Sequence, residues 1–135
     1  MIGTVIFNID LVDKLNLSEM ILFQSFTPNP FPVVKQAKFT VLTSRYEGFP
    51  MTILESLACG TPVISVDCKS GPNEIIKNEY NGLLVENNNI KALSDAINLF
   101  VLDTKLYNIC KNNSKESISK FNVETISKEW FNILK

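Results

Sequence analysis

Residues 43–74 read TSRYEGFPMTILESLACGTPVISVDCKSGPNE, and this stretch decides the fold. The apolar, β-branched run FTVLT (39–43) leads into it, and a second such run, PVISV (62–66), lies inside it. Between the two runs, an apolar segment begins at Pro50 and ends just before Gly60. Proline is common at the start of a helix and glycine just after its end. The order strand, helix, strand predicts a βαβ unit with two parallel strands.

The flanking sequence continues this alternation. Further strands are predicted over residues 1–9, 20–26 and 83–85, and further helices over residues 11–18, 33–37, 71–77, 90–101, 105–120 and 123–134. This pattern predicts an α/β, Rossmann-like three-layer domain with a mainly parallel sheet of about four to six strands and helices on both faces. Trp130 and Phe131 lie at helical spacing and are predicted to belong to the core.

Composition limits the classes of function. The chain has 135 residues and 45% hydrophobic residues, which suits a single domain with a real core. Its net charge of −1 excludes a basic nucleic-acid surface, and no apolar run is long enough to span a bilayer. There is no histidine, so a His-based triad or a His-ligated metal is excluded. The three cysteines have no CxxC pairing and predict reduced thiols in the cytoplasm.

The loop after residue 43 is predicted to reach the ligand-binding edge of the sheet, because ligands of open α/β sheets bind beyond the carboxyl ends of the strands. The helix after Pro50 leaves the backbone N–H groups of Met51, Thr52 and Ile53 free for phosphate oxygens. Glu55 lies about 7.5 Å further along the helix axis, where its carboxylate can accept hydrogen bonds from a vicinal diol. These features predict a ligand that carries both phosphates and hydroxyls.

Two interpretations of the glutamates stay open from the residues alone. Either Glu47 and Glu55 bind such a ligand, or Glu47 only favours the helix dipole and Glu55 is a polar position on a half-exposed turn. A second loop, residues 70–74, lies at the same edge, but capping of the next helix explains it equally well. Arg45, the single arginine, is predicted to form a structural ion pair, with a phosphate contact as the alternative.

Residues 43–74 resemble the donor-binding segment of retaining glycosyltransferases of the GT-B fold, in particular glycosyltransferase family 4 (group 1). That family carries two glutamates with seven residues between them, as Glu47 and Glu55 have here, and the match continues through ACGTPVIS and SGPNEI. The resemblance implies the C-terminal half of a GT-B fold, incomplete at its N-terminus. Residues 1–135 are then expected to form a single partial nucleotide-sugar-binding domain, with the acceptor domain absent.

The resemblance also implies the roles of the site residues. Glu47 is expected to be catalytic and to approach the transferred sugar, while Glu55 holds the nucleotide ribose. The implied donor-binding residues besides Glu55 are Gly48, Phe49, Pro50, Met51 and Thr52. No metal and no cofactor are expected, because the nucleotide-sugar donor is a substrate. The arginine and lysine that clamp the diphosphate in the family have no counterpart here.

The function implied is transfer of a sugar from a nucleotide sugar to a glycan or lipid-linked acceptor, as in polysaccharide or lipopolysaccharide biosynthesis. The alternative is a truncated, inactive nucleotide-sugar-binding remnant, or a subunit that needs a separate acceptor-domain protein. The expected location is cytoplasmic, with peripheral membrane association of a complete enzyme left open. A flavodoxin-like binding protein is a poorer interpretation, because it leaves the paired glutamates unexplained.

Overall fold

The computed structural model describes residues 9–134 and divides the chain after Pro30 into two compact units. The described part of the first unit contains one helix, α1 (Ile9–Lys14), earlier and shorter than the helix predicted over residues 11–18. The predicted strand over residues 20–26 is wrong, since this segment is irregular. The sheet among the described residues consists of β1 (Thr40–Leu42), β2 (Val63–Asp67) and β3 (Gly82–Glu86), and residues 20–26 do not belong to it. Of the strand predicted over residues 1–9, residues 1–8 lie outside the described residues, and Ile9 belongs to α1.

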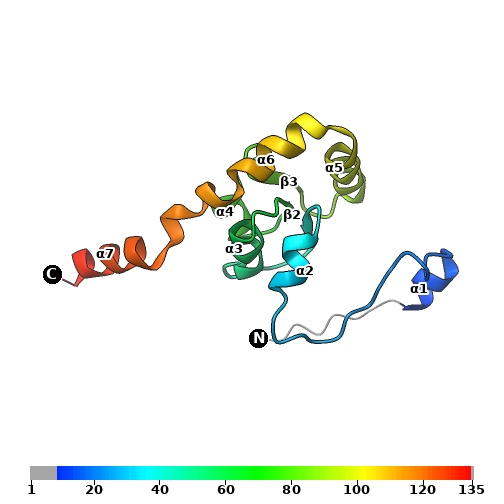
Figure 1. Ribbon diagram of the computed structural model, residues 1–135, viewed down its shortest axis with the longest axis horizontal. Coiled ribbons are helices and arrows are strands. Elements are labelled where there is room, and N and C mark those ends of the chain that lie inside the picture. Colours follow the sequence, from blue (N-terminus) through cyan, green and yellow to red (C-terminus); the bar gives the residue numbers. More distant parts are fainter. Residues whose placement is uncertain (1–8, 135) are drawn as a thin grey trace. The chain divides into compact units, whose positions relative to one another are not determined.

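The second unit contains the predicted α/β pattern (Figure 1). Its elements are α2 (Phe31–Gln36), β1 (Thr40–Leu42), α3 (Met51–Ala58), β2 (Val63–Asp67), α4 (Pro72–Ile75), β3 (Gly82–Glu86), α5 (Ile90–Leu102), α6 (Thr104–Ser117), the 3-10 turn η1 (Ser119–Phe121) and α7 (Val123–Ile133). The strands form a parallel sheet in the order β1-β2-β3, with Val63 paired to both Thr40 and Gly82. Parallel pairing is therefore confirmed, whereas residues 9–134 contain three strands rather than four to six.

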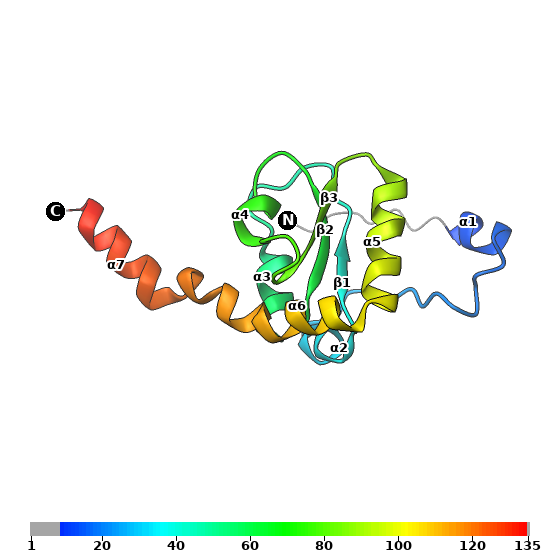
Figure 2. The ribbon, with the colours of Figure 1, turned by 90° about the horizontal axis from the view of Figure 1, so that it is seen from above.

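Helices cover both faces of the sheet, so the α/β three-layer fold is confirmed (Figure 2). On one face, α3 and α4 pack around Val63 with the buried side chains of Ile53, Leu57, Ile75 and Ile76. On the other face, α5 and α6 pack around Ile64 with the buried side chains of Leu83, Ala96, Phe100 and Cys110. Successive side chains of a strand point to opposite faces, and this explains why the β-branched run of β2 is apolar at every position between residues 62 and 66 except Ser65.

A chain of hydroxyl contacts fixes α3 against the sheet. The Thr40 and Ser56 hydroxyls lie 2.7 Å apart, and the Ser56 hydroxyl donates to the Thr61 carbonyl at 2.9 Å. The Thr61 hydroxyl donates in turn to the Val34 carbonyl of α2 at 2.9 Å. Buried polar groups stabilise a structure only when they are paired, and these are. The contacts hold the helix that carries Glu55 at a fixed position beside β1.

The buried side chain of Asn81 joins α4 to α6. Its amide nitrogen donates to the Ile75 carbonyl at 3.0 Å and to the Ser117 hydroxyl at 2.9 Å. Its amide oxygen accepts from the backbone N–H of Lys77 at 2.9 Å. One side chain therefore satisfies two backbone groups at the end of α4 and also contacts α6.

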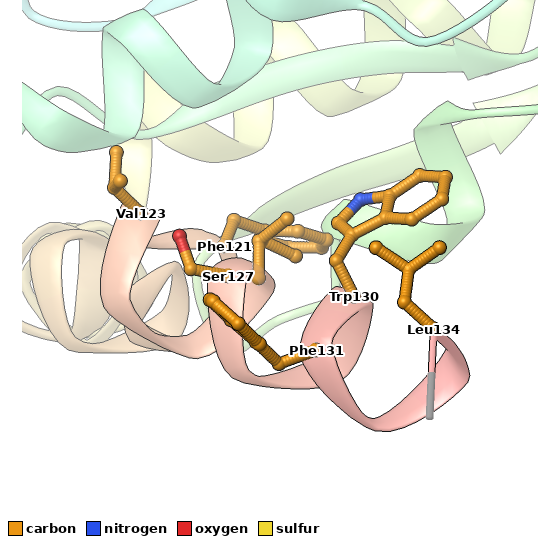
Figure 3. A pocket seen from close by; sticks show the side chains of 7 residues that line it. Phe121, Val123, Ser127, Trp130, Phe131 and Leu134 are labelled. Atoms are coloured by element: carbon orange, nitrogen blue, oxygen red, sulfur yellow. The ribbon is translucent and has the colours of Figure 1, made fainter.

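The C-terminal helix α7 is confirmed, but the prediction that it supplies core residues is wrong. It has no buried residue, and the side chains of Trp130 and Phe131 are 60% and 70% exposed. Its apolar face lines a cavity together with Phe121, and Figure 3 shows Trp130 and Leu134 on the same side of the helix. Periodicity shows that one face of a helix is apolar, but not which element covers it.

Candidate functional site

The loop between β1 and α3 contains the residues that the sequence analysis singled out. It leaves the carboxyl end of β1, which is the edge predicted for the ligand. Tyr46 of this loop forms a parallel bridge with Lys69, in the loop that follows β2. The two loops therefore continue side by side beyond the sheet.

The N-terminus of α3 lies at the same edge. The helix begins at Met51, so Pro50 is the residue before the first helical position rather than the first helical residue itself. The backbone N–H of Ile53 donates to the Pro50 carbonyl at 3.0 Å, so the prediction of three free donors is wrong. A tightened first turn of this kind is a common way to satisfy a helix end. Met51 and Thr52 keep N–H groups without a partner among the described residues.

Glu55 and Glu47 are both half-buried. Within residues 9–134, neither carboxylate takes part in a hydrogen bond or an ion pair; the ion pair found there joins Lys91 and Asp95. Burial, followed by the negative charge of Glu47, raises the pKa of the Cys68 thiol. Glu47 is thus close enough to the end of β2 for its charge to act there. Two half-buried acceptors without internal partners are available to a hydroxyl-bearing ligand.

The loop after β2 supports the loop that carries Glu47. The Ser70 hydroxyl lies 2.6 Å from the Lys69 carbonyl oxygen and 3.2 Å from the Glu47 carbonyl oxygen, so its one proton is shared between these two acceptors. Gly71 has a φ of 99°, and a Cβ atom on it would lie 2.4 Å from Cδ of Pro50 and 3.4 Å from the carbonyl oxygen of Gly48. No side chain fits there, and glycine is the residue that adopts this φ without strain. Sequence reasoning missed this contact, although the Gly-Pro pair at residues 71–72 is a signal for a constrained turn.

The predicted donor-binding residues differ in accessibility. Gly48, Met51 and Thr52 are exposed, and no atom would lie within 4 Å of a Cβ on Gly48. Phe49 is 41% exposed, and its ring meets the Phe121 ring edge-on with the centroids 5.6 Å apart. Pro50, the last residue of the loop, is buried.

In the part of the chain that the structure describes, no three His, Cys, Asp or Glu side chains are grouped so that they could hold a metal ion. All three cysteines are free thiols. None of the described helices combines the length and the apolar character that crossing a membrane requires.

Comparison with known proteins identifies the family. Residues 8–117 match the family described as Glycosyl transferases group 1. The chain belongs to the group 1 glycosyltransferases. The match includes β1, α3, β2 and the loops between them, so Glu47 and Glu55 lie within the matched residues.

Relatives are found among bacterial transferases. The chain is 33% identical over 119 residues to N-acetylgalactosamine-N,N'-diacetylbacillosaminyl-diphospho-undecaprenol 4-alpha-N-acetylgalactosaminyltransferase of Campylobacter jejuni, covering 88% of the chain and 33% of that enzyme. It is 30% identical over 124 residues to poly(ribitol-phosphate) alpha-N-acetylglucosaminyltransferase of Staphylococcus aureus, covering 91% of the chain and 25% of that enzyme.

Solved structures support the fold of this group 1 glycosyltransferase chain. A mutant of S. aureus TarM in complex with fondaparinux, alpha-GlcNAc-glycerol and UDP superposes with a TM-score of 0.85 at 30% identity, covering 92% of this chain and 25% of that one. The lipopolysaccharide galactosyltransferase WaaB gives a TM-score of 0.82 at 27% identity, covering 93% of this chain and 36% of that one. The chain therefore has the fold of the C-terminal half of a GT-B enzyme and spans about a quarter to a third of its relatives.

Proposed function

We propose that this chain is the donor-binding part of a group 1 glycosyltransferase that uses a nucleotide sugar. The observation that carries the proposal is the pair of half-buried carboxylates, Glu47 and Glu55, without partners among residues 9–134, beside the open N-terminus of α3. In this proposal the N–H groups of Met51 and Thr52 bind the diphosphate, because a helix N-terminus favours anions. Glu55 accepts hydrogen bonds from the ribose.

Glu47 is proposed to act on the transferred sugar. It precedes the exposed Gly48, where a ligand can approach the backbone without meeting a side chain. A carboxylate in that position can accept hydrogen bonds from the sugar hydroxyls. It can also stabilise the positive charge that develops on the sugar in the transition state. The loop after β2 lies against the loop that carries Glu47 through the Tyr46–Lys69 bridge and the contact of the Ser70 hydroxyl with the Glu47 carbonyl.

The acceptor is proposed to be a glycan or a lipid-linked glycan. The two relatives compared above are named for transfer to a diphospho-undecaprenol-linked sugar and to poly(ribitol-phosphate). We also propose a cytoplasmic location, since all three cysteines are free thiols. No metal is invoked, because the positive end of α3 can meet the phosphates directly.

Replacement of Glu55 by glutamine is expected to weaken binding of UDP. The change keeps the shape of the side chain but removes its charge, and hydrogen bonds to a charged group are worth about 1.5–3 kcal/mol. A loss of roughly tenfold to a hundredfold in affinity is expected. Calorimetric titration of the whole chain with UDP and with UDP-sugars measures it.

Glu116→Gln is the matched control, because Glu116 is an exposed glutamate on α6. It should bind UDP like the unaltered chain. Glu47→Gln should lower affinity for a UDP-sugar more than affinity for UDP itself, since its proposed partner is the sugar. Equal UDP binding by Glu55→Gln and Glu116→Gln would place the nucleotide elsewhere.

A further inference from the structure

A second polar cavity opens at the carboxyl edge of the sheet. It has a volume of about 390 Å³ and is lined by Arg45, Tyr46, Lys69, Asn87 and Asn88. These residues follow the ends of all three strands β1, β2 and β3. The parallel bridge between Tyr46 and Lys69 holds the first two loops together. The volume lies within the usual range of ligand pockets, roughly 300–1,000 Å³.

The polar groups of this cavity are mainly donors. Arg45 was predicted to form a structural ion pair, but no ion pair of Arg45 is found within residues 9–134, so that prediction is wrong. The ammonium group of Lys69 likewise has no hydrogen-bond partner among the described residues. Two cationic groups at one cavity favour an anionic ligand.

Asn87 adds a further donor. Its amide oxygen accepts the backbone N–H of Asn88 at 2.9 Å, and Asn88 has a φ of 60°. With the oxygen engaged inside the loop, the two N–H bonds of the Asn87 amide remain for a ligand. The backbone turn at Asn88 therefore leaves the amide nitrogen of Asn87, rather than its oxygen, available to a ligand.

Carboxylates lie near the cavity but do not line it. Asp67 and Glu86 are the exposed last residues of β2 and β3, and Oε2 of Glu86 accepts from the Asn89 side chain at 2.9 Å. Glu47 follows Tyr46 in the same loop but does not line the cavity. The negative charges of these carboxylates oppose long-range attraction of anions. An anion in the cavity would therefore be bound by direct hydrogen bonds from the donors that line it.

We propose that this cavity, formed by Arg45, Lys69 and Asn87, is a phosphate-binding site separate from the N-terminus of α3. The guanidinium and ammonium groups would make charge-assisted hydrogen bonds to phosphate oxygens, and the Asn87 amide would add a neutral one. The inference deepens the proposed function and rests on it for the origin of the phosphate. Both cavity and α3 N-terminus flank the loop with Glu47, so a phosphate here lies on a substrate that reaches the same centre.

The test titrates the whole chain with inorganic phosphate, glycerol 3-phosphate and UDP at constant ionic strength, with backbone amide NMR shifts as the readout. Inorganic phosphate is expected to shift the amides of Arg45, Lys69 and Asn88. The double variant Arg45→Gln, Lys69→Gln should bind it about tenfold more weakly or worse. The matched double variant Lys105→Gln, Lys128→Gln removes two exposed lysines and should bind it unchanged.

The ligands distinguish two sources of the phosphate. If glycerol 3-phosphate still shifts the cavity amides at saturating UDP, the phosphate belongs to a second substrate; if UDP itself shifts them, it belongs to the nucleotide. Either result supports the site. Equal phosphate affinity of the two double variants, or shifts confined to Met51 and Thr52, would overturn it. Failure of the proposed function is read separately, from the effect of Glu55→Gln on UDP binding.

Discussion

Replacement of Gly71 by alanine is expected to destabilise the fold by about 2–5 kcal/mol, a large share of the stability of a typical domain. Its φ of 99° strains any residue with a Cβ, and the new methyl group would lie 2.4 Å from Cδ of Pro50. The strain costs roughly 1–3 kcal/mol and overpacking roughly as much again. Cδ of Pro50 is bonded to the backbone nitrogen, so relief requires the backbone before α3 to move. Urea denaturation or thermal unfolding measures the loss.

Gly48→Ala is the matched control for this change. Gly48 has no positive φ and no atom within 4 Å of the added methyl group, so its effect on stability should stay within about 0.5 kcal/mol. Its proposed effect is on binding instead, because the methyl group would stand where the ligand approaches the backbone. If the Gly71→Ala chain unfolds at the same urea concentration or temperature as the Gly48→Ala chain, the close packing of Gly71 against Pro50 does not stabilise the fold.

The parts of the fold that were predicted correctly have local causes. The helix α3 was predictable because Pro50 and Gly60 mark its ends and apolar residues recur along it. The strand β2 was predictable because a short β-branched run between two turn signals suits a buried parallel strand. In each case the propensity of the segment and its place in the structure agree.

The wrong predictions depend on partners that sequence patterns do not reveal. Residues 20–26 have the apolar character of a strand but are not part of the sheet that the described residues form. Trp130 and Phe131 lie on a true amphipathic helix that no described element covers. Arg45 was assigned an ion pair, whereas the loops after β2 and β3 place a lysine and two amides around the cavity that it lines.

The candidate site shows the same division. The spacing of Glu47 and Glu55 around a helix start is readable from the sequence, and the resemblance gives it a role. That the loop after β2 supports Glu47 through Ser70 and Gly71 requires knowing that the two loops run side by side. The loss of the Ile53 donor depends on one tightened turn at the start of α3. Residue types do not specify the exact boundary of a helix, so such a turn is not readable from the sequence.

Purified residues 1–135 are expected to bind UDP weakly and to transfer no sugar by themselves. The chain spans 33% and 25% of the two curated relatives compared above, so most of each relative has no counterpart in it. Holding an acceptor against the donor is worth about 7–11 kcal/mol of barrier, or at least roughly a hundred-thousandfold in rate. The measurement is release of UDP from a labelled UDP-sugar, with and without sugar acceptors.

The same assay separates the two hypotheses for the chain. If it is the donor-binding part of an active transferase, joining it to the remaining part of a group 1 relative should restore transfer, and Glu47→Gln should abolish that transfer while UDP binding persists. If it is an inactive remnant, the joined protein should bind UDP through Glu55 and still transfer nothing. Turnover by residues 1–135 alone would contradict the expectation outright, because these residues would then hold both substrates. The cavity beside Arg45 and Lys69 would in that case be the first place to look for the acceptor, since it shares the Glu47 loop with the N-terminus of α3.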